Sequence, residues 1–289
     1  MATIRHRSVK LGDVEVFYRE AGDPDAPVLL LLHGFPTSSH QFVRLMRRLA
    51  GRWRLVAPDL PGFGQTVTPE GFTFTFDRLA EVVGEFVDAL ELRRYALYVF
   101  DFGAPTGLRL AVSRPHQIAA LITQNGNAYV EGLGPAMPDF PSLTDETEAR
   151  RGFEAILEPE QIRYQYTGAR DPETIDPSNY LLDQYFLERP GRAEAMLDLF
   201  WDYRNNPPAY PAFQAWLREA QPPVLAVWGR NDPFFVPAGA EAFRNDVPSA
   251  EVHFFDTGHF ALEEDLEPIS ELIDRFLAAH LVTMQESGH

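Results

Sequence analysis

The chain has 289 residues, 45% of them hydrophobic, and its 42 acidic and 25 basic side chains give a formal net charge of −17 at pH 7. Such a negative field disfavours nucleic acid and anionic membrane surfaces as partners. The absence of cysteine excludes disulfides and a thiol nucleophile. We expect a cytoplasmic protein without a metal site, because no apolar run can span a bilayer and the eight histidines lack ligand spacing.

Apolar runs alternate with helical patterns along the first part of the chain. We predict strands over residues 14–21, 28–32, 54–57, 95–100 and 118–124. Helices are expected between them, from Ser39 to residue 50, from Asp77 to residue 90, and over residues 103–113, with Ser39 and Asp77 as caps. This alternation is typical of a mostly parallel sheet with helices on both faces.

The alternation stops at residues 129–218, a stretch rich in proline, acidic residues and tyrosine, with short helical pieces such as 193–203. It then resumes with strands at 224–228 and 251–255, a segment at 238–246 between them, and a final helix with an apolar stripe at 269–281. We therefore predict an α/β core formed by residues 1–128 and 219–289. A mainly helical cap is inserted at residues 129–218.

The sharpest predicted turn follows the strand at 95–100. One polar residue, Asp101, separates this strand from the next helix, and Gly103 and Gly107 supply the small residues that a nucleophile elbow needs. No Gly-x-Ser-x-Gly motif occurs in the chain. Taken alone, Asp101 fits N-capping of that helix equally well, so a role as nucleophile depends on residues elsewhere.

Two such residues follow late strands. His259 lies in a Gly-His pair after the strand at 251–255 and is a candidate base at neutral pH. Asp232 comes after Asp101 and before His259, which is the chain order of nucleophile, acid and base expected at such a site. Their structural alternatives are an ordinary turn aspartate and a packed histidine.

A third segment, His33-Gly34-Phe35-Pro36, ends an early buried strand. The backbone N–H groups of Phe35 and Phe102 are candidates for an oxyanion hole, while His33 is expected to bond loop backbone. Because ligands of open α/β sheets bind at the carboxyl ends of the strands, these segments predict one site.

Together these motifs resemble those of the α/β-hydrolase superfamily, and more narrowly its epoxide hydrolase and haloalkane dehalogenase branch. The matching segments are His33-Gly34-Phe35-Pro36, Asp59-x-Pro61-Gly62-x-Gly64, Asp101-x-Gly103, Asp232 and Gly258-His259. The resemblance implies a helical cap over the site and no cofactor. An aspartate in this position implies an alkyl ester on Asp101, which His259, oriented by Asp232, hydrolyses with water.

The leaving group distinguishes epoxides from alkyl halides. Dehalogenases of this branch usually carry tryptophan where this chain has Phe102, and often asparagine where it has Phe35. Fluoroacetate dehalogenases carry arginines where Phe102 and Pro105 stand. These departures favour an epoxide, although epoxide hydrolases too often have tryptophan in place of Phe102.

Epoxide hydrolases use cap tyrosines to protonate the opening oxygen. Residues 201–205 resemble their second tyrosine motif, which makes Tyr203 a candidate donor, with packing of the cap as its alternative. Tyr166, or else Tyr164, is the candidate first tyrosine. Trp201 would instead donate to a halide, and only one of Trp201 and Tyr203 is expected to face the pocket, since they are two positions apart on a helix.

The leading hypothesis is a hydrolase that opens a small apolar epoxide to a diol, with water as its second reactant. A haloalkane dehalogenase with atypical halide donors is the first alternative. A non-catalytic, ligand-binding member of the superfamily is the second. A serine esterase is disfavoured because no serine occupies an elbow, and a homodimer is left open.

Overall fold

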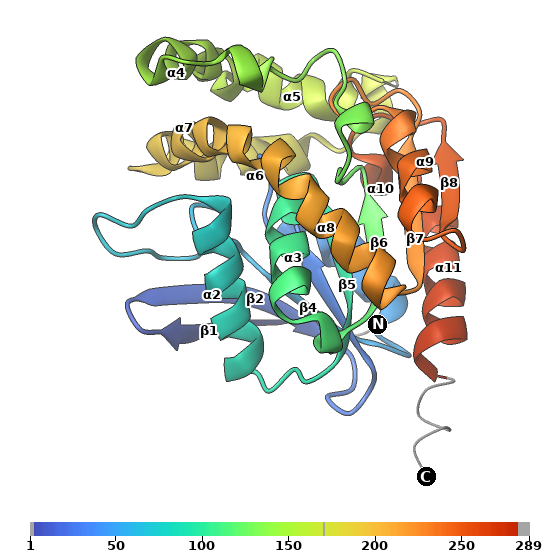
Figure 1. Cartoon of the computed structure of the whole chain (residues 1–289). Helices are drawn as coiled ribbons and strands as arrows, with labels where there is room; N and C mark the ends of the chain where they lie inside the picture. Colours follow the sequence, from blue (N-terminus) through green and yellow to red (C-terminus); the bar gives the residue numbers. More distant parts are fainter. Residues whose placement is uncertain (1–2, 170, 283–289) are drawn as a thin grey trace.

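A computed structural model describes residues 3–169 and 171–282, and one eight-stranded sheet forms its centre (Figure 1). The strand order is β1-β2-β4-β3-β5-β6-β7-β8. β2 pairs antiparallel with β1 and β4, and all other neighbours pair parallel. The strands are β1 Arg5–Leu11, β2 Val14–Ala21, β3 Val28–Leu32, β4 Arg54–Pro58, β5 Tyr95–Phe100, β6 Ile118–Gln124, β7 Val224–Gly229 and β8 Glu251–Phe255.

The strand predictions are confirmed, and β2, β3, β5, β6 and β8 have the predicted bounds. β5 and β6 are buried at every position, as unbroken apolar runs predict for central strands of a parallel sheet. The edge strand β1 has no counterpart among the predicted strands. Its side chains are mostly exposed, so its sequence carries no apolar pattern.

Helices cover both faces of the sheet, which confirms the predicted α/β class (Figure 1). α2, α3, α8 and α9 contribute to one hydrophobic core, and α1 and α11 contribute to another on the opposite face. The helices are α1 Val43–Leu49, α2 Phe76–Ala89, α3 Gly103–Ser113, α4 Glu146–Glu154, α5 Pro159–Thr167, α6 Pro177–Leu187, α7 Arg192–Asp202, α8 Asn206–Ala220, α9 Pro237–Asp246, α10 Ala261–Glu264 and α11 Leu266–Leu277.

Two helix starts differ from prediction. Thr75 caps α2, because its hydroxyl accepts from the Arg78 N–H, whereas Asp77 lies in the first turn. Ser38 caps a 3-10 turn, Ser39–Phe42, that leads into α1. The hydroxyl of Ser39 is used elsewhere, since it donates to the buried carboxylate of Asp59 and accepts from the guanidinium of Arg19.

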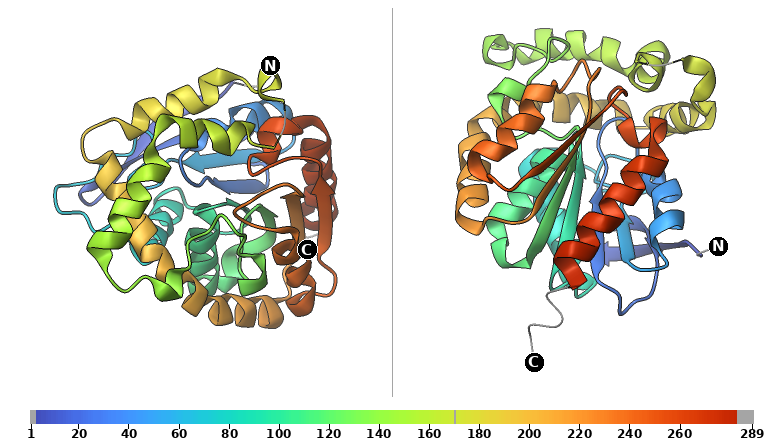
Figure 2. Two further views of the ribbon diagram at one scale, coloured as in Figure 1. Left: turned by 90° about the horizontal axis from the view of Figure 1, so that it is seen from above. Right: turned by 90° about the vertical axis from the view of Figure 1, so that its right-hand side faces the viewer.

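Between β6 and β7 the described residues form helices and 3-10 turns but no strand. α4 to α7 lie as a layer above the carboxyl ends of the central strands, and the view from above in Figure 2 shows them across the core. α8 then runs back beside α3, so the predicted division at residue 218 falls inside a helix that packs on the core. Within residues 3–169 and 171–282, no helix is long and apolar enough to cross a membrane.

Candidate functional site

Asp101 occupies the turn between β5 and α3. Its φ of +47° lies in the left-handed region, which residues other than glycine rarely adopt and which is common at functional turns. The carboxylate does not cap α3, whose N-cap is Phe102 and has no side-chain cap bond. Instead Oδ1 accepts a 2.6 Å hydrogen bond from the N–H of Phe35. The helix-cap alternative is therefore not what the structure shows.

Two glycines permit the close approach of these segments. A Cβ atom on Gly34 would lie 2.3 Å from Oδ1 of Asp101, and one on Gly103 would lie 2.3 Å from the carbonyl oxygen of Leu32. Both distances are shorter than any real contact of a Cβ atom. The elbow therefore requires glycine at both positions for reasons of space.

His259, in the loop after β8, lies between two carboxylates. Its Nδ1 is 2.8 Å from Oδ2 of Asp232, and its Nε2 is 3.8 Å from Oδ2 of Asp101. Asp232 can only accept when ionised, so Nδ1 carries the proton of the neutral ring and Nε2 is left as an acceptor. The structure thus brings together the three residues that the sequence places after β5, β7 and β8.

Besides His259, two further donors hold Asp232 in place. The side-chain amide of Asn125 donates to Oδ2 at 2.7 Å, and the N–H of Phe234 donates to Oδ1 at 2.8 Å. Asn125 also accepts the N–H of Gly229 at 3.2 Å, which fixes its amide. Asn125 is missing from the residues predicted from sequence, although its place directly after a strand, like that of Asp101, is a signal for it.

Burial and charge shift the protonation of the central pair. Burial raises the pKa of Asp101 to about 6, against the opposing effects of His259 and of the N–H groups of Phe102 and Phe35. Burial alone would lower the pKa of His259, but the neighbouring charges of Asp232 and Asp101 outweigh it and raise that pKa. At pH 7 Asp101 is therefore mostly ionised, the form in which a carboxylate is a nucleophile.

A family model described as alpha/beta hydrolase fold matches residues 27–266. The chain belongs to this family. It is 46% identical over 277 residues to an uncharacterized hydrolase, YNR064C, of Saccharomyces cerevisiae. The matched region covers 93% of this chain and 96% of that protein. The expected α/β-hydrolase enzyme is thereby confirmed.

Two further relatives belong to the branch that the motifs resemble. Epoxide hydrolase 2 of Caenorhabditis elegans is 26% identical over 249 residues, which covers 82% of this chain and 69% of that protein. Haloalkane dehalogenase 2 of Mycobacterium tuberculosis is 40% identical over 138 residues, which covers 48% of this chain and 43% of that protein. The resemblance stated from the motifs is confirmed at the level of this branch.

In this α/β-hydrolase, a small cavity of about 40 Å³ lies over Asp101. Its polar lining consists of Asp101, His259, Tyr203 and Gln165. The rest of the lining is apolar and largely aromatic: Phe35, Phe102, Ala136, Met137, Pro138, Phe140, Ile156, Phe200 and Phe234. The described residues thus place one tyrosine and one amide over the carboxylate.

Tyr203 begins a 3-10 turn, Tyr203–Asn205, after α7, and its ring stacks on Phe140 with centroids 4.7 Å apart. Burial, followed by the nearby Tyr210 and Asp101, raises its pKa well above the ordinary value, so the hydroxyl stays protonated. The hydroxyl of Tyr203 is hydrogen-bonded to Tyr210, which also accepts from the side-chain amide of Asn127 at 3.4 Å. Neither Tyr210 nor Asn127 has a sequence signal beyond its residue type.

The structure places the other two predicted cap donors away from the cavity. The ring of Tyr166 stacks on Phe260 at 3.7 Å between centroids, and its hydroxyl bonds to the buried carboxyl of Asp183. The guanidinium carbon of Arg204 lies 3.5 Å from the centroid of the Trp201 ring. Neither Tyr166 nor Trp201 is among the described residues that line the cavity. Tyr203 does line it, so only one of Trp201 and Tyr203 faces the cavity, as their spacing of two residues predicts.

The peptide between Gly34 and Phe35 is held at both ends. Its carbonyl oxygen accepts from Nδ1 of His33 at 3.0 Å, and its N–H donates to Asp101. Nε2 of His33 accepts from the N–H of Leu60 at 2.9 Å, so the ring is neutral, and burial lowers its pKa to about 4. His33 therefore orients this N–H through loop backbone, as expected.

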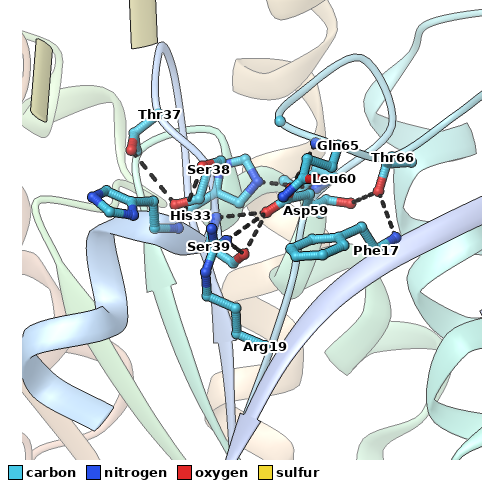
Figure 3. Close-up of polar contacts among 12 residues, drawn as sticks. Phe17, Arg19, His33, Thr37, Ser38, Ser39, Asp59, Leu60, Gln65 and Thr66 are labelled. Carbon is cyan, nitrogen blue, oxygen red and sulfur yellow. Dashed lines mark hydrogen bonds and ion pairs between the residues drawn. The ribbon is translucent and has the colours of Figure 1, made fainter. Parts of the chain in front are cut away.

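Asp59 anchors the same loop to the sheet (Figure 3). Its Oδ1 accepts from the N–H of Ser39 at 2.8 Å and from the Ser39 hydroxyl, and its Oδ2 accepts from the N–H of Gln65 at 2.7 Å. Arg19 on β2 lies 3.6 Å from Oδ1. Because a buried carboxylate must be paired and hydrogen-bonded, this cluster fixes the loop that carries Phe35.

Proposed function

We propose that this hydrolase opens small apolar epoxides to diols through a covalent ester on Asp101. The observation that carries the proposal is the pairing of groups in one small cavity. An ionisable carboxylate sits at a nucleophile elbow, and the protonated hydroxyl of Tyr203 lines the same space. A nucleophile for carbon and an acid for the departing oxygen are the two groups that ring opening needs.

In the first step, Oδ2 of Asp101 attacks one carbon of the epoxide, since Oδ1 is already held by the Phe35 N–H. The carbon–oxygen bond of the ring breaks, and the released oxygen takes the proton of Tyr203. A neutral hydroxyalkyl ester on Asp101 results. The histidine is not needed as a base in this step, because the carboxylate is already charged.

In the second step Asp101 is a neutral ester, so its charge no longer raises the pKa of His259. Nε2 of the neutral ring takes a proton from water, and the hydroxide adds to the ester carbonyl carbon of Asp101. The oxyanion forms at Oδ1, where the N–H of Phe35 supports it, and the N–H of Phe102, which also bonds the Asp101 carboxyl group, is the second donor. Collapse breaks the bond to the alkyl oxygen, which leaves as the diol with the remaining water proton. His259 has gained one proton and Tyr203 has lost one, so return of this proton to Tyr203 restores the enzyme.

The cavity lining supports a small, uncharged substrate. About 40 Å³ of free space corresponds to a few water molecules, and no lysine or arginine occurs among the described lining residues. A carboxylate-bearing substrate would therefore meet Asp101 without a compensating cation. Helices α4 to α7 would act as the cap that keeps bulk water from the ester.

Haloalkane dehalogenation is the second candidate, because a curated haloalkane dehalogenase is 40% identical over 48% of this chain. The lining argues against it. A departing halide ion needs N–H donors, and among the described lining residues no tryptophan is present. Gln165 is the only side-chain N–H donor there besides His259.

The purified protein should be incubated with propylene oxide, butylene oxide and styrene oxide, and in parallel with bromoalkanes of matching size. The proposal predicts diol from at least one epoxide, no halide release, and diol formation at background level for Asp101→Ala. Halide release without diol would instead support the second candidate. Binding without turnover of either class would support the ligand-binding alternative.

A further inference from the structure

We propose that the side-chain amide of Gln165 is a second hydrogen-bond donor to the epoxide oxygen, beside Tyr203, in the ring-opening step. This inference rests on the proposed function and assigns the one polar lining group that the two steps above leave unused. Asp101 attacks, His259 activates water and Tyr203 gives a proton, which leaves Gln165.

The environment of Gln165 is that of a group awaiting a ligand. Its side chain, on α5, is 8% exposed. Among the described residues no hydrogen bond to its amide is found, and its N and O atoms are not among the fully buried atoms that lack a partner, so they keep access to open space. Gln165 is one of the residues that line the cavity over Asp101. A polar atom of the substrate in this cavity would therefore complete its hydrogen bonding.

The geometry of helix α5 explains why Gln165 lines the cavity and the neighbouring Tyr166 does not. Successive residues of an α-helix point about 100° apart, so Gln165 and Tyr166 face different neighbours. Tyr166 is committed to Phe260 and Asp183. Tyr164, on the other side, is 49% exposed. Only the amide of this segment is left to meet the substrate.

The chemistry of an amide limits what Gln165 can do. It has two N–H donors and no ionisable proton, so it can stabilise negative charge but cannot protonate the oxygen. A donor aimed at developing charge in a site with little water accelerates the step in which that charge forms. The two donors therefore have different tasks. Tyr203 gives its proton to the epoxide oxygen, and Gln165 stabilises only the negative charge that develops on this oxygen in the transition state.

The test uses the His259→Gln enzyme, in which ester formation proceeds and ester hydrolysis is blocked. Ester formation with butylene oxide is followed by rapid quenching and intact-protein mass spectrometry. In this background Gln165→Met and Gln165→Leu each remove both donors and keep a side chain of similar volume. Gln161→Met is the matched control, because Gln161 lies one turn earlier on α5 and is exposed.

We expect ester formation to slow by at least about tenfold in both Gln165 variants and to be unchanged in the Gln161 variant. Unchanged ester formation in either folded Gln165 variant overturns the inference and leaves the proposed function intact. The same holds if Gln165→Met slows turnover only when His259 is present, because the amide would then position water. If the enzyme with Gln165 intact forms no ester, the proposed function fails, and the inference fails with it.

Discussion

Nε2 of His259 lies 3.8 Å from Oδ2 of Asp101. This is too long for a direct hydrogen bond, whereas Nδ1 of the same ring is 2.8 Å from Asp232. A base that must deprotonate a serine contacts it directly. The longer separation here suits a histidine that acts on a water between itself and an ester on Asp101. The two residues therefore divide the reaction between them, and each step can be blocked separately.

The His259→Gln variant is expected to accumulate the ester. Glutamine can hydrogen-bond to Asp232 but cannot take a proton from water, so the first step proceeds and the second stops. After incubation with butylene oxide, intact-protein mass spectrometry should show a gain of one substrate mass, and peptide mapping should place it on Asp101. A covalent adduct at any other residue would contradict the assignment of the nucleophile.

Ester formation should decline in acid. The pKa of Asp101 is raised to about 6, chiefly by burial, and only the ionised carboxylate attacks. The rate should therefore be near its plateau at pH 7 and fall about tenfold per pH unit below about pH 6. Because the charge on His259 lowers this pKa, the midpoint should move to higher pH in His259→Gln. A rate that stays flat down to about pH 5 would be inconsistent with Asp101 as nucleophile.

Replacing the nucleophile should stabilise the fold. The pKa of Asp101 is 3.8 in its ordinary state and about 6 here. Between these values the folded state binds more protons than the unfolded state, so wild-type stability falls as pH rises through this window. Asp101→Asn does not ionise, and at pH 7 it should be more stable by up to about 3 kcal/mol. Urea denaturation of both proteins at about pH 4 and pH 7 measures this difference, and an equal difference at both would refute the assigned cause.

Tyr210 should matter for ring opening although it does not line the cavity. Its hydroxyl accepts from the side-chain amide of Asn127 and is hydrogen-bonded to the hydroxyl of Tyr203, so it fixes where the Tyr203 hydroxyl points in the cavity. Tyr210→Phe should slow ester formation by about three- to tenfold.

Tyr95→Phe is the control for this prediction. Tyr95 is an equally buried tyrosine whose hydroxyl has no hydrogen-bond partner among the described residues. Loss of that hydroxyl should leave the rate of ester formation unchanged. Equal rates for wild type and both variants would remove the orienting role of Tyr210.

Much of the core site follows from strand ends. Asp101 comes directly after β5, and Asp232 and His259 lie in the loops that follow β7 and β8. Parallel strands bring their carboxyl ends to one edge of a sheet. Chain order alone is therefore enough to predict that these three side chains meet. Asn125 obeys the same rule and is missed only because an asparagine after a strand also fits an ordinary turn.

The cap side of the site does not follow from sequence in the same way. Tyr164, Gln165 and Tyr166 are consecutive on α5, and the helix pattern there does not say which of them faces inward. The choice is made by Asp183 on α6, which binds the hydroxyl of Tyr166, and by Phe260, which follows β8 and stacks on its ring. Local periodicity carries no information on such partners.

The origin of the diol oxygen tests the central claim, a covalent ester on Asp101, most directly. Excess enzyme is given butylene oxide for a single turnover in oxygen-18 water, and both diol and protein are analysed by mass spectrometry. If Asp101 is the nucleophile, the added oxygen of the first diol comes unlabelled from its carboxylate, and the label appears in the peptide that contains Asp101. Label in the diol and none in the protein would mean that water attacks the epoxide directly, and would contradict the account.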